Sequence, residues 1–367
     1  MLLVAGKAHP GLISFWDQPR KGANFFNRIE SAERFQAAAD AGFEVIRLVP
    51  DKWKGAKRDF LIGSADRFTR IVPGDLAKLV RALDWAQAAK IKVVVGMLSL
   101  PGNRWAQFNR GRTSDFRLYR DRKYQDQAVE CWRQLAKALA GHPAVAGYNI
   151  VNEPHPGKKN DTKEFDLSAF YDRVIAAIRE SDPETPVVLD GDDYGSPDGI
   201  QRLRPAADPN VIYAFHYYGP WEYASGQNKG RWTYPGMIPE WDGATTSKYW
   251  DAAAIAHAME PVARWQAQYR IPANRIWAAE FGIVRTNPGA PKWLEDVLAT
   301  ITGHGWHWAL YSFREDVYPA MDLELGTKPG LGMDVWAVID RGETPNLKRG
   351  PNPLWDVVSR RLKTPAP

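Results

Sequence analysis

Short apolar runs alternate with longer amphipathic segments along most of this chain. The runs are rich in Val, Ile and aromatic residues, as buried strands are, while the segments between them carry apolar side chains at helical spacing. The pattern predicts strands at residues 22–27, 43–49, 91–98, 145–151, 187–190, 211–216, from 275, and at 305–312. It predicts helices at residues 31–41, 75–90, 124–140, 167–181, 197–203, 249–269, 291–302 and 354–362.

Strands that alternate with helices in this way indicate a parallel sheet covered by helices. Closure into a (β/α)8 TIM barrel is the simplest arrangement for a chain of 367 residues. An open doubly wound sheet is the alternative, and we disfavour it because no glycine-rich phosphate loop follows an early strand. The chain has no repeat, low-complexity tract or linker, so we expect one catalytic barrel domain over residues 1–367. Leu2–Val4 and Leu12–Phe15 predict a short N-terminal hairpin that plugs the bottom of this barrel.

Two glutamates stand where predicted strands end. Asn152-Glu153-Pro154 follows the fourth strand, and Glu280-Phe281-Gly282 follows the start of the seventh. In barrels of this kind the catalytic groups lie at the C-terminal ends of the strands. A carboxylate at such a position does little for stability but is well placed for chemistry at the barrel mouth. The pair therefore suggests acid/base and nucleophilic work on a glycosidic bond.

Other strands present further polar and aromatic side chains at the same end. The second strand places Arg47 among apolar neighbours, and a buried arginine is costly unless a carboxylate pairs with it. An ionised glutamate at the barrel mouth is the natural partner, and a structural salt bridge with Glu44 is the alternative. The sixth and eighth predicted strands present His216, Tyr217, Tyr218, Trp308 and Tyr311.

Composition and charge narrow the classes of partner. The net charge is +5, but Lys and Arg are spread among Asp and Glu, so we expect no nucleic-acid partner. The arginine-rich segment 104–123 favours a solvated loop that leads into a helix, and contact with an acidic sugar polymer is the alternative. No apolar run is long enough to span a bilayer, and we expect no membrane partner. The single cysteine, Cys131, excludes an internal disulfide and is expected to be a buried, inert thiol.

Tryptophan is unusually frequent, with 16 residues. Pyranose rings offer a flat apolar face that stacks on indole and phenol rings, whereas a tryptophan folded over the barrel rim would serve packing alone. The tryptophans in predicted loops are Trp53, Trp105, Trp221, Trp232 and Trp241. The long aromatic loop from Trp221 to Trp241 is expected to form a wall of the cleft.

Together these motifs resemble glycoside hydrolase family 5, the cellulase-like family of two-glutamate barrels. The resemblance rests on Ile46-Arg47-Leu48, Asn152-Glu153-Pro154, His216-Tyr217-Tyr218 and Glu280-Phe281-Gly282, in the order of the family, and it covers roughly residues 22–311. It implies a retaining double displacement, in which Glu280 is the nucleophile and Glu153 is the acid and then the base. It also implies substrate-binding roles for the set Arg47, Asn152, His216, Tyr218, Trp308 and Tyr311. The two carboxyl groups should then lie about 5–5.5 Å apart.

Two positions depart from the family pattern. Leu98 stands where many members carry a histidine after the third strand, and Tyr311 stands where a tryptophan usually lies under the sugar, with Trp308 as the other candidate. Both changes suggest a non-standard substrate subsite and argue against assuming plain cellulose. Asp190, Asp192 and Asp193 could bind calcium, but a solvated loop is favoured. We expect no metal site and no cofactor; His304 and His307 lack a third zinc ligand at suitable spacing.

The sequence therefore predicts a retaining glycoside hydrolase that cleaves β-glycosidic bonds in a β-glucan or related polysaccharide, with an endo-β-1,4-glucanase as the default. An endo-β-mannanase or an exo-acting β-glycosidase is the near alternative. A non-catalytic carbohydrate-binding barrel and a metal-dependent barrel hydrolase are alternatives of other classes. We expect a monomer that binds oligo- or polysaccharides. Because such substrates lie outside cells, we expect a periplasmic or secreted protein, although no signal segment is visible and a cytoplasmic location stays open.

Overall fold

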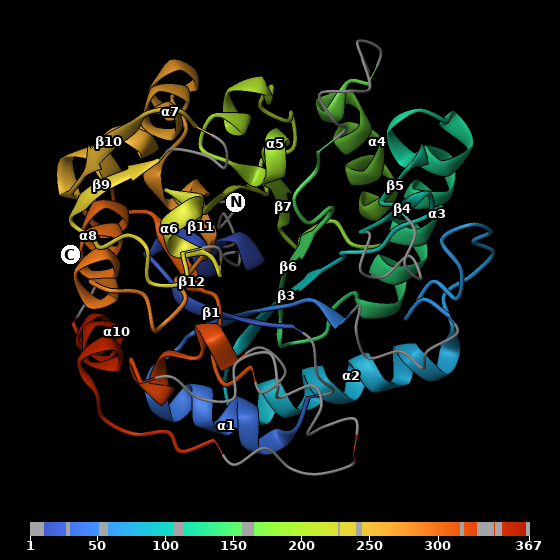
Figure 1. Cartoon of the computed structure of the whole chain (residues 1–367). Coiled ribbons are helices and arrows are strands. Elements are labelled where there is room, and N and C mark those ends of the chain that lie inside the picture. The colour runs from blue at the N-terminus through green and yellow to red at the C-terminus, as the bar shows by residue number, and fades with distance from the viewer. Residues whose placement is uncertain are drawn as a thin grey trace, which may run out of the picture.

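Eight parallel strands form a closed barrel at the centre of the molecule (Figure 1). The computed structural model describes residues 11–26, 30–50, 58–105, 113–155, 165–226, 228–239, 244–315, 319–328, 341 and 347–364. The barrel strands are β1 (Lys21–Phe25), β2 (Val45–Leu48), β3 (Lys92–Gly96), β6 (Val145–Asn149), β7 (Val187–Asp190), β8 (Val211–Tyr217), β11 (Ile276–Phe281) and β12 (His307–Leu310). They neighbour one another in chain order, and β1 closes the circle by pairing with both β2 and β12. The predicted (β/α)8 barrel is confirmed.

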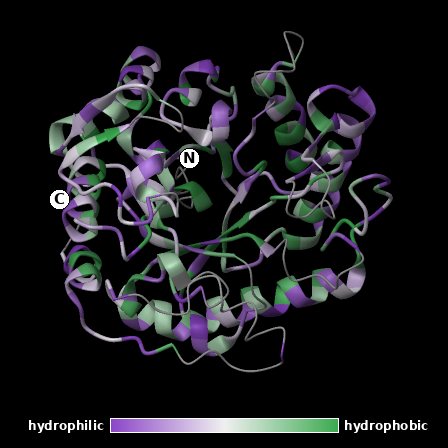
Figure 2. Cartoon of the chain, in the orientation of Figure 1, coloured by the Kyte–Doolittle hydropathy of each residue, from purple (hydrophilic) through white to green (hydrophobic). Residues whose placement is uncertain are grey.

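Helices surround the barrel on its outside (Figure 1). They are α1 (Ala32–Ala41), α2 (Pro73–Ala88), α3 (Arg122–Leu139), α4 (Leu167–Arg179), α7 (Ala252–Tyr269), α8 (Ala290–Gly303) and α10 (Pro353–Lys363). The short helices α5 (Asp192–Gly195) and α6 (Trp221–Ala224) belong to the loops that follow β7 and β8. Capping side chains fix several of their starts: Ser31, Asp166 and Asp251 each accept a hydrogen bond from a backbone N–H in the first turn. The helices mix hydrophobic and hydrophilic residues along their length (Figure 2), as expected for helices with one face on a sheet.

Strand residues alternate between two apolar layers. In β2, Val45 faces the barrel interior, whereas Ile46 and Leu48 pack outward in the main core shared with the helices. Arg47 lies between these outward residues and so faces the interior. The alternation of side chains along a strand thus places a charged residue in the barrel.

The segment ahead of β1 closes the N-terminal end of the barrel, but not as a hairpin. Residues Leu12–Asp17 form a 3-10 helix, so the strand predicted at Leu12–Phe15 is wrong, and Leu2–Val4 lies outside the described residues. The indole of Trp16 packs against Trp277 and His307 and donates a hydrogen bond to the carbonyl of Ala146. The prediction that this segment closes the bottom of the barrel is therefore confirmed for Leu12–Asp17.

The loops at the C-terminal ends of the strands contain small elements that the pattern did not predict. β4 (Asn103–Arg104) pairs with β5 (Asp115–Phe116), and β9 (Gly236–Pro239) pairs with β10 (Ser247–Trp250), both antiparallel. In the region predicted as a helix at 197–203, the structure has a 3-10 turn, Gly199–Arg202. Among the residues that the structure describes, no helix combines the length and apolar character needed to cross a membrane.

Candidate active site

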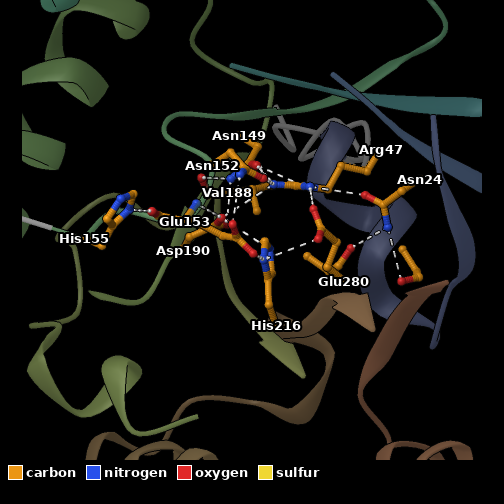
Figure 3. Close-up of polar contacts among 12 residues, drawn as sticks. Asn24, Arg47, Asn149, Asn152, Glu153, His155, Val188, Asp190, His216 and Glu280 are labelled. Atoms are coloured by element: carbon orange, nitrogen blue, oxygen red, sulfur yellow. Dashed lines mark hydrogen bonds and ion pairs between the residues drawn. The ribbon is translucent and has the colours of Figure 1, made fainter. Parts of the chain in front are cut away.

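A cavity of about 850 Å³ opens at the C-terminal ends of the barrel strands. Both glutamates singled out by the sequence, Glu153 and Glu280, line it, together with Asn152, His216 and Tyr218. One carboxylate oxygen of Glu153, one of Glu280 and one ring nitrogen of His216 lie within 4.8 Å of one another. Residues far apart in the chain thus meet at one pocket (Figure 3).

A β-bulge aims Glu280 into the barrel. The register between β11 and β8 shifts after Ala278, so that Ala279 and Glu280 together oppose one residue, His216. Ala279 packs with the interior layer, while Phe281 packs outward against Trp308. Strict alternation would have pointed Glu280 toward the helices, and the extra residue reverses this.

Arg47 holds Glu280 from below the cavity. Its Nη1 donates to Glu280 Oε1 at 2.7 Å, and its Nη2 donates to Asn152 Oδ1 at 2.6 Å. The hydroxyl of Tyr218 donates to the other Glu280 oxygen at 2.7 Å. Both carboxylate oxygens of Glu280 therefore receive a hydrogen bond, one of them from a permanent cation.

Glu153 has a different environment. Its Oε1 lies 2.9 Å from Nδ1 of His216, and its backbone N–H donates to Asp190 Oδ2 at 3.1 Å. Burial raises the pKa of Glu153, and the charge of Glu280 adds to this, while the hydrogen bond to His216 opposes it. The net shift is upward, so Glu153 holds its proton to a higher pH than an ordinary glutamate.

Asp190 at the end of β7 joins the two halves of the site. Its carboxylate accepts from Asn149 Nδ2 at 2.8 Å and lies 3.5 Å from Arg47 Nη2 and 3.4 Å from His216 Nε2. Burial lowers the pKa of His216, but the carboxylates of Glu280, Asp190 and Glu153 outweigh it and raise that pKa. Asp190 thus lies between the guanidinium of Arg47 and the imidazole of His216.

Most predicted site residues meet at the cavity, but two do not line it. Trp308 is a correction: it is 2% exposed and packs outward against Phe43 and Phe281, because residues 307 and 309 take the inward positions of β12. Arg47 is fully buried beneath the cavity and binds asparagines and Glu280, the predicted kind of partner, and not the alternative Glu44, so it is a positioning residue and not a substrate contact. Glu44 pairs with Arg20 instead.

The aromatic predictions have mixed outcomes. Tyr311 lines the cavity and lies edge-on to Phe26, with ring centres 5.4 Å apart. Trp105 and Trp221 line it as well. Trp53 and Trp241 lie outside the described residues. Leu98 also lines the cavity, packed with Phe26 and Val49, so an apolar patch occupies the place of the family histidine.

Several functional residues escaped the sequence reasoning. Asp190 was expected in a solvated loop and is instead fully buried. Asn24 and Asn149 orient Arg47 from β1 and β6. The alternation of side chains along a strand could have identified the two asparagines. Asn24, Arg47 and Asn149 all occupy interior positions near the C-terminal ends of their strands.

Other residues singled out by the sequence have different surroundings. In the described part of the arginine-rich segment, Arg104 pairs with Asp59 and Asp66, and Arg117 pairs with Asp66 and Asp115. His307 lies at the barrel bottom, where burial lowers its pKa to about 3. Burial raises the pKa of the Cys131 thiol, as expected for an inert cysteine.

The three groups Glu153, His216 and Glu280 are close enough to contact one cation. Each of them already has a strong polar partner, and Arg47 places a positive charge 2.7 Å from Glu280. A divalent ion would have to displace the proton shared by His216 and Glu153 and tolerate this guanidinium. The donor set is therefore better suited to proton transfer than to holding a metal.

A closed barrel with two facing carboxylates at the C-terminal ends of its strands has the architecture of a barrel glycoside hydrolase. The family model for cellulase, glycosyl hydrolase family 5, matches residues 14–316. The chain belongs to this family, whose members are retaining glycoside hydrolases.

The sequence identity to individual relatives is low. Endoglucanase C of Acetivibrio thermocellus is 27% identical over 212 residues, which cover 58% of this chain and 56% of that protein. The probable glucan 1,3-beta-glucosidase A of Emericella nidulans is 28% identical over 205 residues, or 55% of this chain and 46% of that protein. The chain thus spans about half the length of the curated relatives that it matches. The solved structure of Pseudomonas stutzeri endoglucanase Cel5A has a TM-score of 0.64 at 19% identity and covers 95% of this chain and 97% of that one. This likeness concerns the fold.

Proposed function

We propose that this protein is a retaining β-glycosidase that cleaves a β-glucan or related polysaccharide by double displacement. The observation that carries the proposal is the pair of carboxylates, Glu153 and Glu280, within 4.8 Å of each other in an open cavity. Inverting enzymes need about 6.5–9.5 Å between their carboxyl groups to admit a water molecule, and retaining enzymes need about 5 Å. The short separation supports the retaining course.

Glu280 is the nucleophile in this proposal. Arg47 and Tyr218 stabilise its negative charge and leave it facing the cavity. It attacks the anomeric carbon as the bond to the leaving oxygen breaks, which forms a glycosyl-enzyme. Glu153 donates its proton to the leaving oxygen and then takes a proton from the incoming water, which releases the sugar from Glu280.

The remaining residues bind the sugar. Asn152 lines the cavity with its amide fixed by Arg47, which suits a hydrogen bond to the 2-hydroxyl group. Tyr311 provides an aromatic floor, and Tyr194 and Trp221, which are 50% and 53% exposed, provide stacking faces at the rim. No cofactor takes part in this chemistry.

An endo-β-1,4-glucanase is the default activity. An endo-β-mannanase or an exo-acting β-glycosidase is the alternative within the class, and relatives named for β-1,4- and β-1,3-glucan cleavage both match. A screen of β-1,4- and β-1,3-glucans and mannan, with product analysis by chain length, separates these activities. Polymeric substrates of this kind also favour export to the periplasm or medium.

The roles of the two glutamates are tested by chemical rescue. Glu280→Ala and Glu153→Ala should each lower kcat on an aryl β-glucoside by more than about 10³-fold. With azide and an activated substrate, E280A should form the α-glycosyl azide and E153A the β-glycosyl azide, because azide replaces the nucleophile in one and the water in the other. Glu180→Gln, an exposed residue paired with Arg133, is the control and should keep full activity. A native protein that binds glucans but hydrolyses no glycoside would be a non-catalytic barrel and would refute the proposal.

A further inference from the structure

Glu153 has an unusual backbone. Its φ is +50°, in the left-handed region that residues other than glycine rarely adopt. Such a conformation costs about 1–3 kcal/mol and persists only where the surrounding structure holds it. The contacts that hold this residue therefore also set the direction of its carboxyl group.

Three hydrogen bonds fix the chain around this strained residue. Asp190 accepts the N–H of Glu153, and the N–H of Tyr194 donates to the carbonyl of Pro154 at 3.2 Å. The third bond comes from a side chain that the double displacement does not use: Nδ1 of His155 lies 2.7 Å from the carbonyl oxygen of Glu153 (Figure 3). A carbonyl can only accept, so Nδ1 carries the hydrogen and donates it.

The imidazole of His155 is held in place by three aromatic rings. It stacks on Tyr194 with ring centres 4.1 Å apart and planes 18° apart, and it contacts Trp105 at 4.5 Å and the edge of Phe116 at 4.9 Å. It is 5% exposed, and burial lowers its pKa, which keeps the ring neutral. The ring therefore acts as a fixed neutral donor and not as a second titrating group at the site.

We propose that His155 is a positioning residue for the proton donor: its Nδ1–H holds the left-handed backbone of Glu153, and Tyr194, exposed at the rim, keeps the imidazole in place. The inference rests on the proposed function. A misplaced Glu153 fails at one step, the delivery of a proton to the leaving oxygen. The attack of Glu280 does not depend on His155, because Arg47 and Tyr218 orient that carboxylate from other strands.

This difference can be measured with aryl β-glycosides of graded leaving-group acidity. A 2,4-dinitrophenyl leaving group departs without a proton, whereas a phenyl leaving group needs one. His155→Phe keeps the ring and its stacking but removes the N–H. We expect kcat/KM on the phenyl glycoside to fall by about 10–100-fold, part of the usual contribution of a general acid, and kcat/KM on the dinitrophenyl glycoside to change by less than about 3-fold.

A pair of amide variants tests the position of the donor. The amide nitrogen of Asn overlays Nδ1 of histidine, whereas that of Gln reaches the position of Nε2. His155→Asn should therefore keep most activity on the phenyl glycoside, and His155→Gln should lose it as H155F does. This pair keeps the proposal testable if H155F folds poorly.

His304→Phe is the matched control. His304 also stacks on an aromatic ring, Trp306, with ring centres 4.2 Å apart, but it precedes β12 at the other end of the barrel. H304F should leave kcat/KM on both glycosides unchanged. If H155F lowers kcat/KM equally on both glycosides, or on neither, His155 is only a packing residue and the inference is wrong. A native protein inactive on every glycoside would instead refute the proposed function, so the two failures are distinguishable.

Discussion

Two basic and three acidic side chains meet at the centre of the candidate site. Arg47 and His216 are the basic groups, and Glu153, Asp190 and Glu280 are the carboxyl groups around them. Glu153 and Glu280 have the same side chain but different surroundings, because their hydrogen-bond partners differ. Glu280 is bound by a permanent cation and a hydroxyl group, whereas Glu153 shares a proton with an imidazole and is destabilised as an anion by burial.

Replacing Arg47 should lower the stability of the protein as well as its activity. In Arg47→Met, the carboxylates of Glu280 and Asp190 are left buried without their guanidinium. We expect the free energy of unfolding to fall by about 3–5 kcal/mol, measured by urea denaturation. Arg264→Met removes an exposed pair with Glu260 and should change it by less than about 1 kcal/mol. Equal effects of the two variants would contradict the role assigned to Arg47.

The pH dependence of activity should follow the proton on Glu153. In the proposed mechanism the protonated form donates to the leaving group, so kcat/KM should fall as the pH rises through the raised pKa of Glu153. The hydrogen bond and charge of His216 lower that pKa, so in His216→Phe it should rise further and the basic limb of the profile should move to higher pH. A pH–rate profile on a phenyl β-glycoside, whose leaving group needs the proton, measures this. A shift to lower pH would show that another group controls the limb.

The ends of two strands determine whether these residues meet. The bulge in β11 turns Glu280 inward, and the chain after it passes close to the end of β12, where Tyr311 lies. A Cβ atom on Gly282 would stand 2.2 Å from the carbonyl oxygen of Tyr311. Glycine at this position thus lets the loop after Glu280 approach the backbone of Tyr311 closely.

Gly282→Ala should damage the site through this contact. We expect a loss of about 1–3 kcal/mol in the free energy of unfolding, because two backbone segments must separate. We also expect kcat/KM to fall by at least about 10-fold, because Tyr311 or Glu280 must move. Gly303→Ala at the end of α8 is the control, since a Cβ there meets no atom within 4 Å. Unchanged melting and activity in G282A would mean that the close approach is not required.

The charged residues that line the cavity differ in sign from those of the arginine-rich segment. The charged groups that line the described part of the cavity are carboxylates, including Asp193 and Asp198 at the rim, with His216 beside Glu153. The described arginines of the segment 104–123 include Arg104 and Arg117, which are engaged by aspartates. This arrangement favours a neutral glycan over an acidic one.

Salt should therefore have little effect on catalysis. We expect kcat/KM on a neutral glucan to change by less than about 2-fold between low salt and roughly 0.5 M NaCl, because no long-range attraction is screened. A polyuronate should inhibit this reaction weakly. Strong inhibition by a polyuronate that disappears with salt would restore the alternative in which the arginine-rich segment binds acidic sugars.

Removal of metal ions by a chelator should also have little effect on catalysis. Glu153, His216 and Glu280 lie close enough for a metal, but their bonds to one another and to Arg47 favour protons. We expect hydrolysis of an aryl glycoside to persist in excess EDTA and after dialysis against it. Loss of activity that returns with one divalent ion would identify a metal-dependent hydrolase.

The sequence by itself determined the barrel and its two glutamates, because apolar alternation is a local property and parallel strands bring their C-terminal ends to one place. It also placed Tyr218 and His216 at the same end of the barrel as those glutamates. Only the tertiary structure decided which side chains face inward. Trp308 turned out to pack against helices, Arg47 to lie under the cavity, and Asp190 to join both halves of the site. Those outcomes depend on a bulge and on contacts between residues far apart in the chain, which the order of amino acids along a strand does not reveal.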